Sequence, residues 1–455
     1  MATSFMVAAA KKVDFPTFGL PMTPASMAAS LRRDVITIRG LPRDMPRVAV
    51  IGAGAAGIEA ARVAASNGAR VVLLEAGDRV PSPKSSWLTL LDAGNHRRSN
   101  RTEATLSSAG VEVLLNQPVS KVGEDMNVAA AGHMTQYDAV VLSTGSTALP
   151  ERLEGIRKSG AYVLDSEAAF AELGRKLGGV SKAIIEGSGP VAVRVAEKLR
   201  SRHVAVSMLT PGGVMQVLNS APRKVAMEAL ASWGVLVIEA TADKVVGVDR
   251  VEAVVASGDV IPGDCFVVVP KTVPRVPEVH VTLGRSGGVV VDERTQSSRQ
   301  SIYCAGDCAE VWVGSTTMSV MFESSARLMG AVAGANASGG RASASVVGSF
   351  FMELAGVGVA SAGLGLAESA RLGLDVVESS KTWKGELACS LVFDRRTRTV
   401  LGAQLAGRGI AGMAESLPII VAAKMTVDHL AYTESIASSD ISPIEETARE
   451  GASKQ

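Results

Sequence analysis

Residues 47–75 read RVAVIGAGAAGIEAARVAASNGARVVLLE, and this stretch decides the fold. The apolar run at 48–51 predicts a short strand that is buried on both faces. Gly52, Gly54 and Gly57 then match the pattern Gly-x-Gly-x-x-Gly. In this pattern the first glycine permits a tight turn and the second lets the backbone approach a pyrophosphate. The third allows the following helix to pack closely against the strand.

The remainder of the stretch completes a dinucleotide-binding unit. A helix follows the glycine turn and ends at Asn67-Gly68, so its first amides and the positive end of its dipole would face the phosphates. A second strand over 71–74 ends at Glu75, at about the 20-residue spacing of a carboxylate that binds ribose hydroxyls. We therefore expect nucleotide contacts along the turn and at the strand end, including Ala55, Ala56 and Ala76.

Length, charge and cysteine content narrow the possible classes of protein. A chain of 455 residues predicts two to four domains at about 150 residues each. A net charge of +1 gives no argument for a nucleic acid or a membrane as partner. The four cysteines are too few and too scattered for a secreted disulfide framework, which favours the cytoplasm. The five histidines are widely separated and predict no metal site.

The opening pattern returns once along the chain. A strand over 183–186 leads into Gly187, Gly189 and Ala192, and a helix and a second strand follow at the same spacing. This repeat predicts a second dinucleotide-binding unit. Thr210 stands where the first unit has Glu75, so the choice between NADH and NADPH stays open. A loss of nucleotide binding in this unit also stays open.

Three further segments are expected to reach the first nucleotide. A strand over 110–115 would carry Val119 towards the adenosine end. The buried strand at 139–142 ends in Thr144-Gly145, whose small size would let a cofactor lie against the backbone. Gly306-Asp307 follows another strand, and a carboxylate there can accept hydrogen bonds from a polyol chain. A long helix is expected over 315–335.

As an ordered set, these features resemble the pyridine nucleotide-disulfide oxidoreductases. The segments IYCAGDCAE, GLGLAESARLGLDVV, LVFDRRTRTVLGAQLAGRG and MTVDHLAYTES are similar to the NADH oxidase and coenzyme A-disulfide reductase branch. The resemblance implies an α/β fold with two Rossmann-like domains, one for FAD and one for NAD(P), and a C-terminal α/β domain that forms a homodimer. The expected domains are a disordered N-terminal extension over 1–45 (or a misassigned upstream start), the FAD domain over 46–150 and 265–340, the NAD(P) domain over 151–264, and the C-terminal domain over 341–455.

The resemblance also assigns the predicted site residues to two cofactors. FAD would lie on the first turn and the segments that reach it: Gly52, Gly54, Ala55, Ala56, Gly57, Glu75, Ala76, Val119, Thr144, Gly145, Gly306 and Asp307. A nicotinamide nucleotide, as NAD(P)H, would bind at Gly187, Gly189 and Ala192.

The chain departs from these relatives in one respect that concerns the chemistry. They usually carry a redox cysteine in the segment after the ribose-binding acid, yet no cysteine occurs between Glu75 and Cys265. We therefore expect an FAD-dependent oxidoreductase that passes hydride from NAD(P)H to flavin and on to oxygen, a quinone or another small acceptor, with no catalytic residue assigned. Two alternatives are an FAD-binding subunit of a larger redox complex and a disulfide reductase that uses Cys304 or Cys308.

Overall fold

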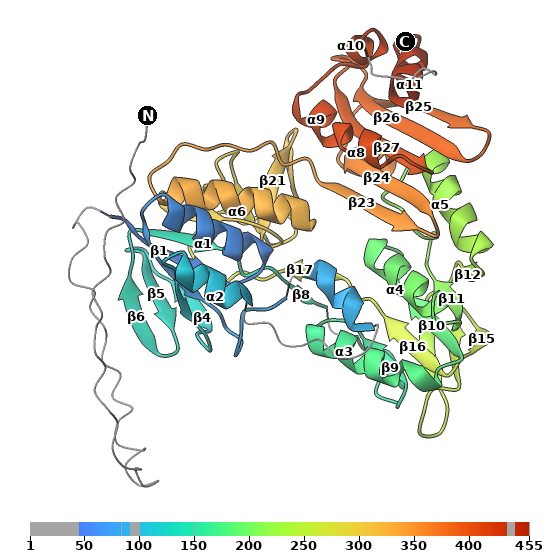
Figure 1. The fold of residues 1–455 in the computed structure, drawn as a ribbon, viewed down its shortest axis with the longest axis horizontal. Coiled ribbons are helices and arrows are strands. Elements are labelled where there is room, and N and C mark those ends of the chain that lie inside the picture. Colours follow the sequence, from blue (N-terminus) through green and yellow to red (C-terminus); the bar gives the residue numbers. More distant parts are fainter. Residues whose placement is uncertain (1–44, 83, 92–100, 150, 435–441, 455) are drawn as a thin grey trace, which may run out of the picture. The chain divides into compact units, whose positions relative to one another are not determined.

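The structure is a computed structural model that describes residues 45–82, 84–91, 101–149, 151–434 and 442–454. The expected N-terminal extension, up to residue 44, lies outside the described residues. Three sheets of five strands organise the rest, together with smaller sheets and the helices that cover them (Figure 1).

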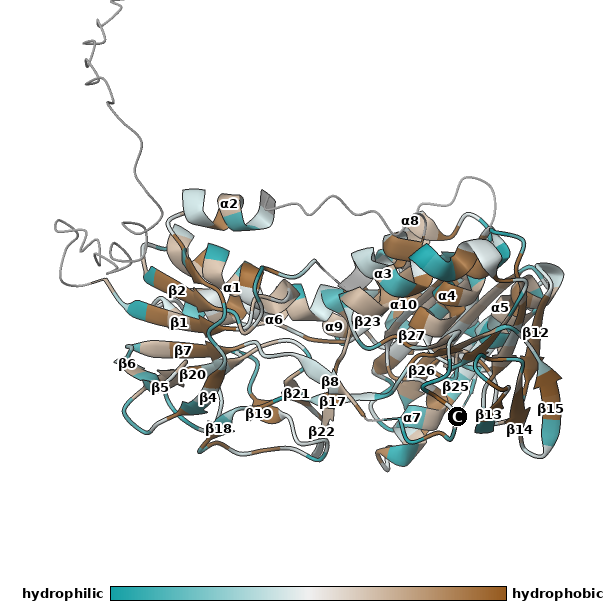
Figure 2. Ribbon diagram, turned by 90° about the horizontal axis from the view of Figure 1, so that it is seen from below, coloured by the Kyte–Doolittle hydropathy of each residue, from teal (hydrophilic) through white to brown (hydrophobic). Residues whose placement is uncertain are grey.

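The first sheet is parallel and has the strand order β20-β7-β1-β2-β3. Its central strands are almost wholly apolar and buried, as strands covered on both faces should be. They appear brown in the hydropathy colouring of Figure 2. The bounds are β1 (Arg47–Ile51), β2 (Arg70–Leu74), β3 (Glu112–Leu114), β7 (Ala139–Leu142) and β20 (Ile302–Cys304).

Two helices pack side by side over this sheet, α1 (Ala55–Ser66) and α6 (Glu323–Ala337) (Figure 1). Small residues bring their backbones into contact. A Cβ added to Gly330 would lie 2.2 Å from the carbonyl oxygen of Ala56, and one added to Gly334 would lie 2.2 Å from that of Ala60. The two glycines therefore set the distance between the helices.

The helix expected over 315–335 is wrong in its first part. Residues Thr316–Ser319 form strand β22, which pairs antiparallel with β21 (Ala309–Val313). Gly314, with φ of 59°, makes the turn between them. The β-branched Thr316 and Thr317 favour a strand, so the helix begins only at Glu323.

The second sheet is also parallel, in the order β12-β11-β10-β16-β9. The bounds are β9 (Ala161–Val163), β10 (Lys182–Glu186), β11 (Ala205–Leu209), β12 (Val235–Ile238), β16 (Cys265–Val268), α3 (Glu167–Lys176), η2 (Leu177–Gly179), α4 (Pro190–Arg200) and α5 (Ser220–Ser232). Because β16 pairs with β10, the chain leaves this sheet after Val268, later than the boundary expected at 264–265. The two parallel sheets confirm the predicted Rossmann-like class.

The third sheet is antiparallel, in the order β23-β24-β27-β26-β25. Strands β26 (Leu387–Asp394) and β27 (Val400–Gly407) form a hairpin, and the other strands are β23 (Ser349–Leu354), β24 (Val357–Gly363) and β25 (Val376–Trp383). Its helices are α7 (Leu366–Arg371), α8 (Ala411–Ala414), α9 (Ser416–Ala422), α10 (Val427–Ala431) and α11 (Pro443–Ala452).

Buried polar contacts join the second and third sheets. The amide nitrogen of Asn219 donates to Gln404 Oε1 at 2.7 Å, and Asn219 Nδ2 donates to Ser390 Oγ at 2.8 Å. Gln404 Nε2 donates back to the carbonyl of Val217 at 2.9 Å. These residues are at most 6% exposed, so their polar groups are satisfied by protein partners, most of them in the neighbouring domain, rather than by water.

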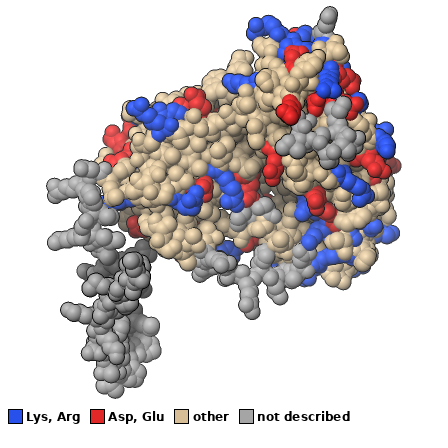
Figure 3. Space-filling view, turned by 45° about the horizontal axis from the view of Figure 1, so that its top comes forward, with Lys and Arg blue, Asp and Glu red and all other residues tan. Residues whose placement is uncertain are grey.

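The remaining elements form small sheets and connections: η1 (Lys84–Leu91), α2 (Arg101–Ser108), β4 (Val119–Val122), β5 (Asn127–Ala130), β6 (His133–Gln136), β8 (Ser146–Ala148), β13 (Ala242–Val246), β14 (Ala253–Ala256), β15 (Asp259–Pro262), β17 (Thr272–Pro274), β18 (Glu278–Val279) and β19 (Val289–Val291). Charged side chains of both signs are interspersed on the face shown in Figure 3. Within the described ranges, no helix combines the length and apolar character needed to cross a bilayer.

Candidate functional site

The first glycine turn has one open position between two closed ones. Gly52 has φ of 99°, and a Cβ there would lie 2.5 Å from the carbonyl oxygen of Ser143. A Cβ on Gly57 would lie 1.9 Å from the carbonyl oxygen of Gly52. At Gly54, by contrast, a Cβ would meet no other described atom within 4 Å. The outer glycines are thus required by packing, and the middle one faces free space.

Glu75 follows β2 and connects two backbone segments beside the turn. Its Oε2 accepts a hydrogen bond from the amide of Ala53 at 2.8 Å, and its Oε1 accepts one from the amide of Gly77 at 2.8 Å. The carboxylate is therefore held at the end of the strand, next to Ala76 and next to the open turn. This is the position that a ribose-binding acid occupies in a dinucleotide fold.

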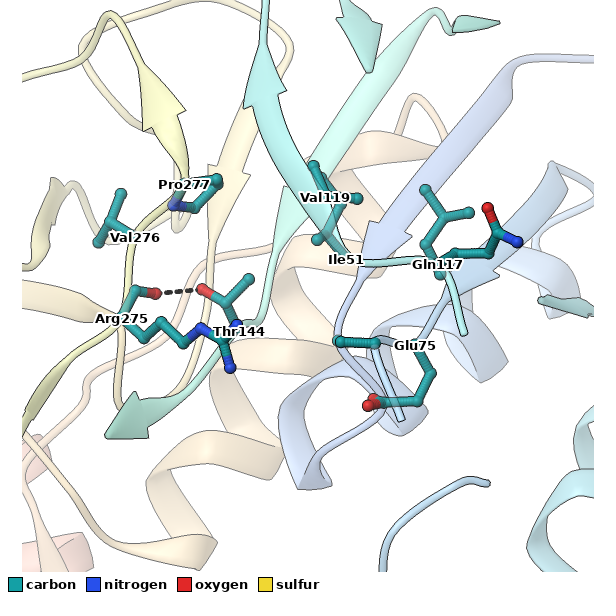
Figure 4. Close-up of a pocket in the computed structure, with 11 residues that line it drawn as sticks. Ile51, Glu75, Gln117, Val119, Thr144, Arg275, Val276 and Pro277 are labelled. Carbon is teal, nitrogen blue, oxygen red and sulfur yellow. Dashed lines mark hydrogen bonds between the residues drawn. The ribbon is translucent and has the colours of Figure 1, made fainter. Parts of the chain in front are cut away.

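A cavity of about 120 Å³ opens at this strand end. In Figure 4, Glu75 and Gln117 lie on one side of it and Thr144 and Arg275 on the other. It is lined by Ile51, Gly52, Leu74, Glu75, Ala76, Gln117, Val119, Thr144, Arg275, Val276 and Pro277. A whole ligand normally needs about 300 Å³ or more, so the cavity corresponds to one part of a dinucleotide.

Arg275, Val276 and Pro277 are the lining residues that sequence reasoning missed. They follow β17, which pairs with β8 directly after Thr144-Gly145. The amide of Arg275 donates to the carbonyl of Gly145 at 2.9 Å, and the Thr144 hydroxyl donates to the carbonyl of Arg275. No local pattern in the sequence marks them, because they reach the site only through this strand pairing.

The structure brings Asp307 to the same edge as the first turn. Its Oδ2 accepts a hydrogen bond from the Ser146 hydroxyl at 2.8 Å. Gly306 has φ of 80°, and a Cβ on it would lie 3.1 Å from the Cβ of Ala56 at the start of α1. The ends of β1, β7 and β20 thus place the predicted FAD residues around one crevice, where open α/β sheets bind ligands.

The second glycine turn repeats this geometry. A Cβ on Gly187, with φ of 150°, would lie 2.9 Å from the Cβ of Ala192, which is fully buried. A Cβ on Gly189 would have no neighbour within 4 Å among the residues described. Pro190 then begins α4, so the middle position is again open at the N-terminus of a helix.

The end of β11 offers no carboxylate to a ribose. Thr210 is fully buried, and its hydroxyl has no hydrogen-bond partner within the described part of the chain. Arg200 lies at the other end of β11, where it donates to the carbonyls of Trp233 and Val204 at 2.8 and 3.0 Å. Arg223 donates to the carbonyl of Val214 at 2.9 Å. The geometry therefore leaves the preference between NADH and NADPH open.

The segment after Glu75 packs on the second domain. Leu90 and Leu91 of η1 are buried in the apolar core of the second domain. The rings of Trp87 and Phe170 pack edge to face, with their centroids 5.8 Å apart. A Cβ on Gly174 would lie 2.1 Å from the carbonyl oxygen of Leu90, so α3 contacts the backbone of η1 directly. Members of the family that the sequence resembles usually carry a redox cysteine in this segment, and this chain has none there.

Cys304 and Cys308 lie inside the first domain. Both side chains are fully buried, and their Sγ atoms are 3.4 Å apart. A bulky disulfide substrate has no access to either sulfur in this structure. No described cluster of three His, Cys, Asp or Glu side chains has the arrangement of a metal site.

The residues present fit the two expected nucleotides. In each turn the backbone is closed by packing at the first position and at the third, and the open middle position leaves room for a phosphate at a helix N-terminus. Glu75 beside the first turn and Asp307 across the crevice supply acceptors for hydroxyl groups. The second turn has the phosphate cradle, but Thr210 stands where the first unit has Glu75.

Comparison with known proteins agrees with a fold that binds two nucleotides. Residues 46–330 match the family model described as pyridine nucleotide-disulphide oxidoreductase. The NADH oxidase of Streptococcus pyogenes is 23% identical over 435 residues, 86% of this chain and 95% of that protein. A solved NAD-dependent persulfide reductase from A. fulgidus is 25% identical, with a TM-score of 0.80 over 89% of this chain and 83% of that one.

A solved water-forming NADH oxidase from Lactobacillus brevis shares the fold, at 18% identity and a TM-score of 0.76 over 90% of this chain and 98% of that one. These findings confirm the predicted class, an FAD- and NAD(P)H-dependent oxidoreductase. The chain belongs to the pyridine nucleotide-disulphide oxidoreductase family.

Proposed function

We propose that the protein oxidises NAD(P)H with bound FAD and passes the electrons to oxygen, a quinone or another small acceptor. The observation that carries this proposal is the pair of glycine turns, one in each parallel sheet, with Gly54 and Gly189 both open. When bound, FAD supplies the redox chemistry, taking hydride from the nicotinamide and releasing electrons to an acceptor.

The chain's own residues bind and orient the two nucleotides. The amides of the first turn of α1, and those that follow Pro190 in the first turn of α4, would hold phosphates at the open glycine positions. Glu75 would accept hydrogen bonds from ribose hydroxyls, and Asp307 from the ribityl chain, while Arg275 adds a cation to the cavity wall. The protein holds the flavin and nicotinamide rings next to each other in the reactive orientation, which removes most of the entropic barrier to their encounter.

The acceptor is proposed from the cysteine content of the chain. A thiol relay needs an accessible cysteine, and none occurs between Glu75 and Cys265, while all four cysteines are buried. Relatives named NADH oxidase favour oxygen. A rubredoxin-NAD(+) reductase of Pseudomonas putida, 26% identical over 58% of this chain and 71% of that protein, favours a small electron-carrier protein as the second candidate.

We also propose a homodimer formed through the C-terminal domain, in the cytoplasm. The resemblance to the family is what motivates this proposal, and the exposed Ile419 and Tyr432 on this domain, at 65% and 83%, are available for such a contact. Analytical ultracentrifugation tests this: a monomer at micromolar concentration refutes it.

Anaerobic stopped-flow mixing tests the central proposal. NADH or NADPH should bleach the flavin absorbance, and admission of oxygen should restore it with formation of peroxide or water. Bleaching without reoxidation by oxygen, but with rapid reduction of an added rubredoxin, would favour the second candidate. A flavin that neither nucleotide bleaches refutes turnover and favours the alternative of an FAD-binding subunit.

A further inference from the structure

The two neighbouring cysteines of the first domain form an unassigned site. Cys304 ends β20, and Cys308 follows the turn at Gly306-Asp307. Their sulfurs are 3.4 Å apart and are buried beneath the crevice where the predicted FAD residues meet. A disulfide bond is about 2 Å long, so the two sulfurs need to approach by about 1.4 Å to join.

We propose that Cys304 and Cys308 are a peroxide-sensitive dithiol, and that their conversion to a disulfide is coupled to occupancy of the cavity lined by Glu75 and Thr144. The proposal does not depend on which electron acceptor the enzyme uses. It requires only the two sulfurs, a peroxide as oxidant and the contact of Cys308 with the carbonyl of Leu142, at the end of the strand that leads into the cavity wall at Thr144.

The surroundings make the two thiols chemically unequal. Burial raises the pKa of Cys304 well above its ordinary value. The hydrogen bond from Cys304 lowers the pKa of Cys308 despite its burial. Because the thiolate and not the thiol reacts with peroxide, we assign the first attack to Cys308, which is also the sulfur that contacts the end of β7.

The other two cysteines show what an ordinary buried thiol looks like in this chain. Burial raises the pKa of both Cys265 and Cys389 to about 12. In the described structure neither has a second sulfur within hydrogen-bond distance. They provide matched controls, since they share the burial of Cys308 without its neighbour.

The reaction balances with one peroxide. The Cys308 thiolate attacks one peroxide oxygen, the O–O bond breaks and hydroxide leaves, which gives a sulfenic acid on Cys308. The Cys304 thiol then attacks that sulfur, the S–O bond breaks and water leaves with the thiol proton. Two thiols are oxidised by two electrons, and the peroxide is reduced to hydroxide and water.

The coupling follows from the position of Thr144. This residue lines the cavity, and it lies two residues after Leu142, the last residue of β7. The Cys308 thiol donates to the carbonyl of Leu142 at 3.6 Å. A disulfide would remove the thiol proton and this hydrogen bond, and would loosen the strand end that carries Thr144. Coupling of this kind is reciprocal, so bound FAD should slow the oxidation, and the disulfide should weaken FAD binding. The loss of about one hydrogen bond corresponds to a roughly three- to tenfold rise in Kd.

Thiol mapping tests the proposal on the full chain, with and without bound FAD. Trypsin leaves both cysteines in the peptide 300–327. After hydrogen peroxide this peptide should lose two hydrogen masses and resist alkylation until it is reduced, and it should do so faster in the FAD-free protein. A 300–327 peptide that still alkylates at both cysteines in both forms overturns the proposal.

Variants and FAD titration separate the steps. Cys304→Ala should stop at a sulfenic acid that dimedone traps on Cys308, whereas Cys265→Ala and Cys389→Ala should still form the disulfide. FAD fluorescence should show the three- to tenfold weaker binding only in proteins that form the disulfide. Equal FAD affinity of the oxidised and reduced proteins overturns the coupling, and disulfide formation in Cys304→Ala overturns the pairing.

Discussion

Replacing Gly54 with alanine tests whether the first glycine turn holds a dinucleotide. Gly54 has φ of −71°, which any residue adopts, and a Cβ there would touch no other described atom within 4 Å. The substitution should therefore leave the fold intact. Alanine is a poorer N-cap than glycine by about 0.5–1 kcal/mol, but it also stabilises through the unfolded chain by about 0.4–1 kcal/mol. The two effects offset each other to within about 0.5 kcal/mol.

The same methyl group would occupy the space into which a phosphate must come. Overpacking of a close contact costs about 1–3 kcal/mol, which corresponds to an FAD Kd raised about 5- to 150-fold. Quenching of FAD fluorescence on titration with apoprotein measures this Kd, and urea unfolding followed by circular dichroism measures the stability.

Gly178→Ala is the matched control, because a Cβ there also has no neighbour within 4 Å in the described structure, and Gly178 does not line the cavity. It should leave the FAD Kd unchanged. A Gly54→Ala protein that is as stable as the parent and binds FAD equally well would refute the assignment of phosphate to this turn.

Three further substitutions test contacts that stabilise the domains. Glu310 is fully buried and accepts hydrogen bonds from the Ser286 amide and hydroxyl and from three other donors; Glu310→Gln should lower the free energy of unfolding by about 2–4 kcal/mol in urea titrations. Burial acts to raise the pKa of Glu310, but these hydrogen bonds lower it overall. The contribution of Glu310 to the free energy of unfolding should therefore be present above the ordinary glutamate pKa and be lost as pH falls through the pKa in the folded protein. Equal urea midpoints of the parent and Glu310→Gln at pH 7 would contradict this. Arg398→Ala should lower the free energy of unfolding by about 1–2 kcal/mol, because it removes two hydrogen bonds to Asp428 and one to the carbonyl of Lys454 after α11. This loss should appear as a lower Tm, whereas the control Arg396→Ala should leave Tm unchanged. Gly330→Ala should lower the free energy of unfolding by about 1–3 kcal/mol, because its Cβ would clash with the backbone of α1; an unchanged value would show that the helices can separate freely.

The parts of the fold that follow from short-range chemistry could be predicted from the sequence. The strand, turn and helix around Gly52 and Gly187 are local, because each glycine answers a steric need within a few residues. The strand at 316–319 was missed, although its two β-branched threonines favour a strand, because the four residues precede a helix without a break and their pairing with Ala309–Val313 is visible only in the fold.

The residues of the candidate site also fall into those that the sequence predicts and those that only the fold brings to the site. Glu75 and Thr144 stand at strand ends that the sequence reveals. Arg275 joins the cavity through a pairing with β8 more than a hundred residues away, which no local pattern reports. The closeness of Cys304 and Cys308 was visible as a spacing of four residues, yet their sulfur contact depends on the turn at Gly306.

The polar contacts between Asn219, Gln404 and Ser390 have a consequence for how the chain folds. If the C-terminal sheet unfolded alone, the second nucleotide domain would expose the apolar face that it shares with Met352, Leu354 and Val359, and these buried amides would lose their partners. The two domains should therefore melt in one cooperative transition. A chain that ends at residue 340 would leave that face bare and would be prone to aggregate. Although the C-terminal domain carries no nucleotide motif, it acts as part of the folding unit that presents Gly187 and Gly189.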